Sequence, residues 1–162
     1  MPNNKTKIVA DPAKQELFIV REFDAPRERV FQAFTDSKTH AQWRGPRGFT
    51  MKLEKFEPYS NGGYRITHTD PQGNNFFFHG VYHEVMAPER IISTFEYDNL
   101  PEKGHVELET VRFEELLGGR TRVTTQVVYQ SVADRDAMYG SGMEQGLIEG
   151  YEQLDELLAK QS

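Results

Sequence analysis

The chain has 162 residues, a formal net charge of -6 and no cysteine, and these three facts limit what kind of protein it is. The length fits one domain with a single core, and the lack of cysteine excludes disulfides and thiolate chemistry. The acidic balance, without a cluster of Lys and Arg, argues against a nucleic-acid or anionic-membrane surface.

The start of the chain is polar and carries no apolar segment of the kind found in secretory signals. No window elsewhere is long and apolar enough to span a membrane. We therefore expect a cytoplasmic protein, with residues 1–13 as a flexible tail and residues 14–162 as a single domain.

One strand and two short helices are predicted after this tail. Residues 15–24 are rich in β-branched and aromatic side chains, which is typical of a strand. Pro26 suits a first helical turn, and the apolar residues after it recur at helical spacing up to Thr35. A second short helix carries Trp43 and ends at the loop 45–48, which contains two glycines and a proline.

Between Phe49 and Tyr129 the apolar side chains recur every second residue, and turn residues separate the short runs. This pattern predicts an antiparallel meander, because no helix-length pattern interrupts it. With the first strand it gives about seven strands. The other predicted strands are 51–57, 64–69, 76–86, 90–97, 105–116 and 120–129.

The stretch 133–160 predicts a long amphipathic helix, because its apolar residues form one stripe and its acidic residues point away from it. Gly146 and Gly150 lie on the apolar stripe, where each glycine costs roughly 0.5–1 kcal/mol relative to alanine. Either another backbone comes very close at these positions, or a space is left open beside the helix.

An antiparallel sheet with one solvated face must cover its other face, and the C-terminal helix is the large apolar element left to do so. The expected fold is therefore of the α+β class, with a curved sheet wrapped around the long C-terminal helix. Folds of this kind tend to hold a pocket where the sheet runs past the helix.

Six segments carry a resemblance to a known superfamily. They are DAPRERVFQAFT at 24–35, WRGP at 43–46, GGYR at 62–65, GVYHEV at 80–85 with PERI at 88–91, GRTRVT at 119–124 and GMEQGL at 142–147. In this order and spacing the chain resembles the SRPBCC superfamily, and within it the bacterial proteins similar to the C-terminal domain of the activator of heat-shock protein 90 ATPase. The resemblance implies a helix-grip, START-like fold with a deep hydrophobic cavity between the sheet and the C-terminal helix.

The strand 76–85 has aromatic residues on both faces, so its inward face is ambiguous. If Glu84 faces water, then Phe77, His79, Val81 and His83 face the core. Two histidines on one face of a strand could chelate a metal, but a metal site needs three or four ligands and no third group has a suitable spacing. We therefore predict no metal and no cofactor.

Glu107 and Glu109 begin the strand face that later carries Val111 and Phe113. Either the two acids point inward or a bulge changes the phase of the strand. An inward glutamate in an apolar pocket could act as a general acid or base with His79 or His83. The alternative is an outward acidic ladder at a sheet edge.

The residues expected at the cavity are chosen by two criteria. One is their position in the segments that resemble the family, and the other is the face of the strand or helix on which they lie. The resemblance places Trp43 beside the cavity mouth, and Thr125 and Tyr129 would supply isolated hydroxyls to a mostly apolar pocket. Arg44 and Arg47, in the next loop, either offer a guanidinium to an anionic group or are solvated. The full set is Trp43, Phe77, His79, Val81, Glu109, Val111, Thr125, Val127, Tyr129, Met143, Gly146 and Leu147.

The leading functional hypothesis is the binding of a hydrophobic or aromatic small molecule in this cavity, with no assigned catalytic residue. An acid–base enzyme of the polyketide cyclase or dehydratase type is one alternative. A chaperone-interacting stress-response module is another, although the chain has no room for the separate N-terminal domain that carries much of the eukaryotic activator's chaperone contact. A homodimer is left open.

Overall fold

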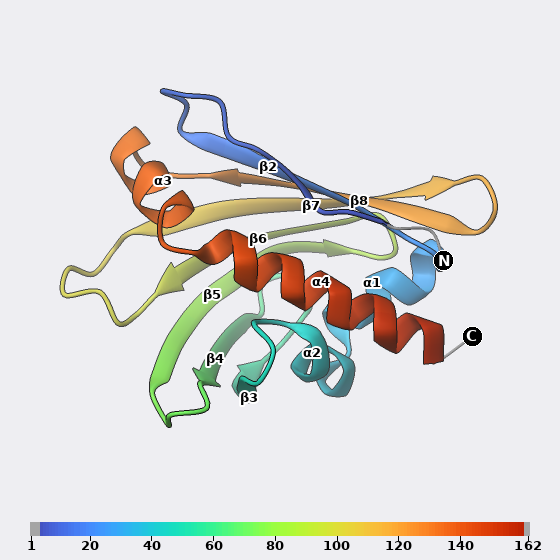
Figure 1. The fold of residues 1–162 in the computed structure, drawn as a ribbon, viewed down its shortest axis with the longest axis horizontal. Coiled ribbons are helices and arrows are strands. Elements are labelled where there is room, and N and C mark those ends of the chain that lie inside the picture. Colours follow the sequence, from blue (N-terminus) through green and yellow to red (C-terminus); the bar gives the residue numbers. More distant parts are fainter. Residues whose placement is uncertain (1–3, 161–162) are drawn as a thin grey trace.

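In a computed structural model that describes residues 4–160, the chain forms an eight-stranded antiparallel sheet with helices on its concave face (Figure 1). The strand order is β1-β2-β8-β7-β6-β5-β4-β3, and each neighbouring pair is antiparallel. This arrangement confirms the expected α+β helix-grip fold, with two short helices after the first long strand.

The boundaries of the predicted long strands agree with the structure to within one residue. The strands are β1 (Lys7–Val9), β2 (Glu16–Phe23), β3 (Thr50–Phe56), β4 (Gly63–Thr69), β5 (Asn75–Met86), β6 (Arg90–Tyr97), β7 (Val106–Leu116) and β8 (Arg120–Val128). The helices are α1 (Arg27–Thr35), α2 (Ser37–Trp43), α3 (Val132–Tyr139) and α4 (Met143–Lys160).

Strand β1 lies where the sequence predicted a flexible tail, so that prediction is wrong for Lys7–Val9. Ile8 lies opposite Ile19 of β2 and packs partly against the core. Three residues are too few to show an alternating pattern, which is why the strand was not predicted from sequence. Residues 1–3 of the predicted tail lie outside the described residues.

The predicted helix 133–160 is divided into α3 and α4, which is a correction to the sequence prediction. Gly142 between them has a φ of +89°, a left-handed conformation that glycine adopts without a side-chain penalty. As a result α3 sits at one end of the sheet, and α4 alone crosses the concave face (Figure 1).

The hydrophobic core fills one half of the space under α4. Tyr151 and Leu154 of α4 are buried against the sheet, and the Tyr151 ring lies 5.4 Å from that of Phe23. From α1, Phe31 and Phe34 pack edge-on against Phe113 of β7. These side chains are bulky enough to close this half, so any open space must lie toward α3.

The two glycines on the apolar stripe of α4 face the loop that follows α2. A Cβ atom on Gly150 would lie 3.1 Å from the carbonyl oxygen of Trp43, and one on Gly146 would lie 3.2 Å from Cγ of Pro46. The side-chain amide of Gln153 also donates to the carbonyl oxygens of Trp43 (3.3 Å) and Gly45 (2.9 Å). Close backbone packing therefore accounts for Gly150, whereas Gly146 both touches the loop and borders the open space described next.

Candidate ligand-binding cavity

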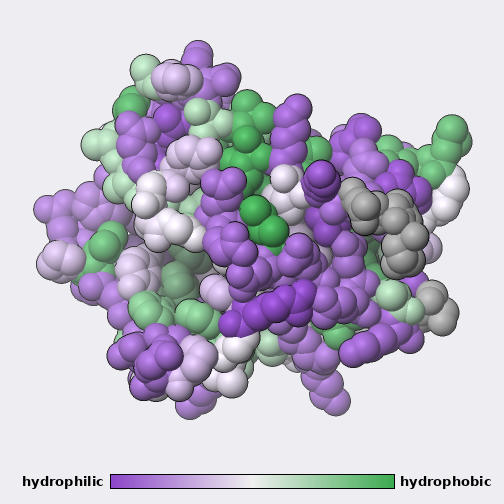
Figure 2. Space-filling view, viewed as in Figure 1, coloured by the Kyte–Doolittle hydropathy of each residue, from purple (hydrophilic) through white to green (hydrophobic). Residues whose placement is uncertain are grey.

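A cavity of two adjoining chambers lies between the sheet and the helices α3 and α4. The inner chamber has a volume of about 240 Å³ and the outer one about 700 Å³. The two chambers share part of their wall; the residues that line both are His68, Phe78, Phe95, Glu107, Tyr129, Met138 and Met143, together with Gly146. Figure 2 shows the hollowed surface on the left of the view, with apolar side chains inside it.

Apolar and aromatic side chains make up most of the cavity wall. The Phe78 ring lies 5.2 Å from the rings of both Phe95 and Tyr97, so three aromatic side chains form one continuous surface. Leu100, in the loop after β6, lies at the outer chamber. Concave apolar sites with few polar groups are typical of small-molecule binding.

Most of the residues expected at the cavity do line its inner chamber. They are Trp43, Glu109, Val111, Thr125, Val127, Tyr129, Met143, Gly146 and Leu147. Trp43 is only 1 % exposed, and its indole nitrogen donates to the carbonyl oxygen of Ala33 at 2.8 Å. Its ring therefore forms part of the wall, but its N–H group is already bonded and is not free for a ligand.

Phe77, His79 and Val81 point to the other face of the sheet, so their expected inward orientation is wrong. Phe77 is 41 % exposed and Val81 55 % exposed. The cause is a bulge: Tyr82 pairs with Ser93 and Glu84 with Ile92, so His83 is one extra residue on β5. Glu84 faces outward as assumed, but the bulge reverses the phase of the strand before it.

Glu107 and Glu109 point inward, which settles the alternatives left open for strand β7. The register of β7 with β8 runs without a shift from Leu108 to Leu116, so no bulge is present there. Glu107 is 7 % exposed, and Glu109 keeps some accessible surface because it faces the inner chamber. The cavity therefore holds two neighbouring carboxyl groups on an otherwise apolar wall.

Burial raises the pKa of both carboxyl groups. The pKa of Glu107 is raised further by the charge of Glu109 and by the hydrogen bond between the two side chains. For Glu109, the nearby Arg44 guanidinium and the bond to Glu107 lower the pKa and so partly offset the burial. The pair therefore holds a proton more tightly than two solvated glutamates would.

Two buried polar atoms in the cavity have no hydrogen-bond partner among residues 4–160. They are Oε1 of Glu107 and the hydroxyl oxygen of Tyr129. Tyr129 is 4 % exposed, and burial raises the pKa of its hydroxyl. In contrast, the hydroxyl of Tyr64 donates to the carbonyl oxygen of Thr94 at 2.5 Å. Glu107 and Tyr129 thus leave hydrogen-bonding capacity unused inside the cavity.

Arg44 is the cation of the inner chamber, and sequence reasoning left its role open. Its guanidinium carbon lies 5.1 Å from the centre of the Trp43 ring, and no carboxylate of the described residues lies within 4.0 Å of its nitrogens. Arg47, in contrast, pairs with Glu156 on the surface of α4 at 2.5 Å. The two loop arginines therefore have different surroundings, which their spacing in the sequence does not show.

Two cavity histidines, His40 and His68, were not expected from the sequence. Burial, followed by the charge of Arg44, lowers the pKa of His40 to about 3 and that of His68 to about 4. Nδ1 of His40 also lies 3.2 Å from the carbonyl oxygen of Phe34. Both rings are consequently neutral at neutral pH and add no positive charge to the cavity.

Comparison with known proteins identifies the family. Residues 24–159 match the family described as "Activator of Hsp90 ATPase homolog 1-like protein". The chain belongs to this family. No protein with a curated functional description matches the chain. Among residues 4–160 of this AHSA1-like protein, no helix is long and apolar enough to cross a membrane.

Solved structures of bacterial proteins share the AHSA1-like fold over nearly the whole chain. A crystal structure of a Rhodobacter sphaeroides protein is 29 % identical, with a TM-score of 0.85 over 96 % of this chain and 99 % of that one. A solution structure from Arthrobacter aurescens is 26 % identical, with a TM-score of 0.85 over 95 % and 91 % of the two chains. The AHSA1 protein from Silicibacter pomeroyi, 19 % identical with a TM-score of 0.74 over 91 % and 99 %, shows the shared fold alone.

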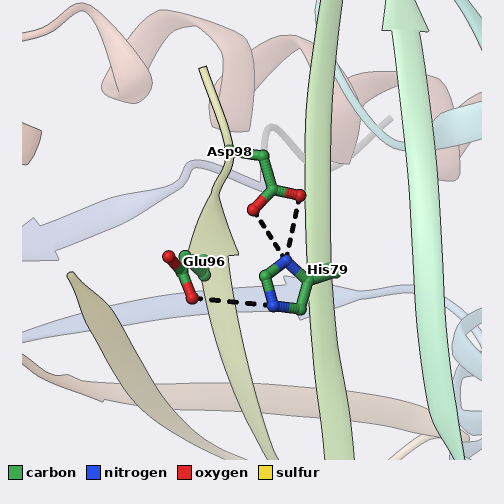
Figure 3. A group of neighbouring side chains, drawn as sticks. All are labelled: His79, Glu96 and Asp98. Atoms are coloured by element: carbon green, nitrogen blue, oxygen red, sulfur yellow. Dashed lines mark hydrogen bonds and ion pairs between the residues drawn. The ribbon is translucent and has the colours of Figure 1, made fainter. Parts of the chain in front are cut away.

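On the outer face of the AHSA1-like sheet, His79 meets two acids that its spacing in the sequence did not reveal (Figure 3). Nδ1 of His79 lies 2.8 Å from Asp98, and Nε2 lies 3.5 Å from Glu96. Arg65 also lies 3.5 Å from Asp98. Because the two acids face different ring nitrogens and a guanidinium adds positive charge, ion pairing accounts for this cluster.

Proposed function

We propose that this AHSA1-like protein binds a hydrophobic or aromatic small molecule in the two-chamber cavity. The observation that carries the proposal is the pair of adjoining chambers under α3 and α4, whose walls are mostly aromatic and aliphatic. Its combined size suits a small organic ligand rather than a few waters. The fold of the family is consistent with this role.

A matched pair of substitutions tests this proposal. Ser93→Leu adds a bulky side chain to the inner chamber, whereas Thr110→Leu adds the same side chain to a position that does not line the cavity. We expect naphthalene, titrated by isothermal calorimetry, to bind the wild type and Thr110→Leu alike. It should bind Ser93→Leu roughly tenfold more weakly, because the chamber loses room.

Native mass spectrometry of the purified protein adds a second measurement, since a bound apolar molecule from the host would appear as added mass. Thermal unfolding of both variants serves as the control for correct folding. Equal affinity of naphthalene for the two variants, or no binding to the wild type, would count against the proposal.

An acid–base enzyme is a second candidate, and the inward orientation of Glu109 favours it. A carboxyl group with a raised pKa in an apolar chamber suits proton transfer near neutral pH. The expected histidine partners, His79 and His83, are not at the cavity, but Glu107, which bonds to Glu109, and Tyr129 also line the chamber and could assist.

Hydrogen–deuterium exchange at the carbon beside the carbonyl of 2-tetralone, followed by NMR, tests this second candidate. Glu109→Gln should abolish any exchange that the wild type catalyses. Exchange no faster with the wild-type protein than in buffer alone would remove the enzyme hypothesis for this class of ketone.

Contact with a chaperone remains a prediction that rests on the family description, which names an activator of Hsp90 ATPase. Addition of the protein to a bacterial Hsp90 should stimulate ATP hydrolysis if the role extends to this chain. An unchanged ATPase rate would argue against it.

A further inference from the structure

The junction between the two chambers holds an incomplete hydrogen-bonding site. Oε1 of Glu107 and the hydroxyl of Tyr129 are both buried, both line the two chambers, and neither has a hydrogen-bond partner among the described residues. The register pairs Leu108 with Val128, so the next residues along the two strands, Glu107 and Tyr129, are cross-strand neighbours. Two residues with unused polar atoms are therefore neighbours on one stretch of an apolar wall.

The protein does not complete this site with its own side chains. No Lys, Arg or His nitrogen of residues 4–160 lies within 4.0 Å of Glu107. Tyrosines 64 and 151, which also line the inner chamber, already bond to Thr94 and Thr125. Leaving buried polar groups unpaired costs stability, so a partner from outside the chain would recover free energy at this point.

We propose that the ligand of the cavity carries a hydroxyl group, which donates a hydrogen bond to Glu107 and accepts one from the hydroxyl of Tyr129. This inference rests on the proposed binding function and names the chemical class: an apolar, ring-containing alcohol or phenol. A hydroxyl is the smallest group that both donates and accepts. An ether or a ketone only accepts, so it would leave Oε1 of Glu107 without a donor.

The charges around the junction favour an uncharged donor over an ammonium group. The charged or titratable groups that act on Glu107 and Tyr129 are Glu109, Arg135 and, through Glu109, Arg44. Because burial raises the pKa of both acids, the pair keeps a proton, and its remaining charge is balanced by Arg44. A neutral hydroxyl leaves this balance unchanged, whereas an ammonium would have to displace the proton.

Three ligands of similar size separate hydrogen bonding from apolar binding: 2-naphthol, 2-methoxynaphthalene and naphthalene. In calorimetric titrations we expect the wild type to bind 2-naphthol roughly tenfold more tightly than the methyl ether. Tyr129→Phe should weaken 2-naphthol and the methyl ether alike, roughly threefold or more relative to naphthalene, because the hydroxyl that donates to the oxygen of both ligands is gone.

Tyr129→Phe is a clean test, since the lost hydroxyl has no protein partner and the backbone bonds of residue 129 with Gln15 are kept. Its thermal unfolding should match the wild type or exceed it. Tyr59→Phe, on the exposed surface, is the matched control and should leave the affinity of 2-naphthol relative to naphthalene unchanged.

The outcomes separate this inference from the function on which it rests. Equal affinity of the wild type for all three ligands would overturn the hydroxyl proposal and leave apolar binding intact. No binding of any of the three would overturn both. Tighter binding of 2-naphthylmethylamine than of 2-naphthol, with release of a proton into the buffer, would show that the junction takes a cation and overturn the hydroxyl proposal.

Discussion

The two faces of the sheet hold similar polar groups under opposite conditions. On the outer face His79 contacts both Glu96 and Asp98 (Figure 3), whereas on the inner face Glu107 and Tyr129 have unused hydrogen-bonding atoms. The outer cluster and the inner pair both come from neighbouring strands and contain similar residue types, so composition alone does not distinguish a ligand site from a structural cluster. What separates a candidate ligand site from a structural cluster here is whether the protein has completed its hydrogen bonds.

Replacement of one acid on each face should produce opposite changes in stability. Glu107→Leu exchanges a buried, incompletely bonded carboxyl for an apolar group of similar size, so we expect the free energy of unfolding to rise by about 1–3 kcal/mol. Glu96→Leu should lower it, because the Glu96 carboxylate accepts from the backbone N–H of Gly104 at 2.8 Å and pairs with His79. Urea unfolding at pH 7 measures both. A loss of stability in Glu107→Leu equal to that in Glu96→Leu would remove the contrast between the faces.

The inner acids should also make the protein less stable as the pH rises above neutrality. The pKa of Glu107 is raised from its ordinary 4.5 in the folded protein, so folding favours the protonated form. Its contribution is present below pH 4.5 and is lost as the pH rises through the raised pKa, with a slope of up to about 1.4 kcal/mol per pH unit. Glu107→Gln should flatten the fall in stability between about pH 6.5 and pH 9.

Histidines also change the stability of the protein with pH, so their contributions must be distinguished from that of Glu107. The pKa values of His40 and His68 are lowered from 6.5, so their contribution is present above pH 6.5 and is lost as the pH falls, opposite to that of the acid. His105, whose pKa is raised first by Asp134 and then by Glu102, adds to the alkaline fall in both proteins. The difference between the wild type and Glu107→Gln therefore reports the Glu107–Glu109 pair and not the histidines. Parallel stability curves for the two proteins would contradict the prediction.

The smallest expected effect belongs to the outer cluster. Asp98→Asn weakens ion pairs to a histidine and an arginine that are partly solvated, so we expect a loss below about 1 kcal/mol in urea unfolding. Addition of Zn²⁺ should leave the melting temperature of the wild type unchanged. A zinc-dependent rise that disappears in Asp98→Asn would instead identify the outer cluster as a metal site.

Strands β5 and β7 show how far strand periodicity carries a prediction of the site. In β7 the spacing of Glu107, Glu109 and Val111 placed them on one face, and the structure keeps them together. In β5 the same reasoning assigned the wrong face to the residues before the bulge. The extra residue at Tyr82–Glu84 depends on pairing with β6 and not on local sequence. The sequence also did not show that Arg44 would line the cavity and Arg47 would pair with Glu156, since α4 is far from both arginines in the chain.

The sequence by itself determined the order of the elements, the antiparallel sheet, the covering C-terminal helix and the family, because local periodicity, turn residues and short motifs encode these features. The tertiary structure decided the division of the last helix, the inward direction of the two acids and the pairing of His79 with its acids. It also decided which polar atoms remain unpaired in the cavity. These features depend on strand register and on contacts between distant segments, and a single sequence carries no local signal for them.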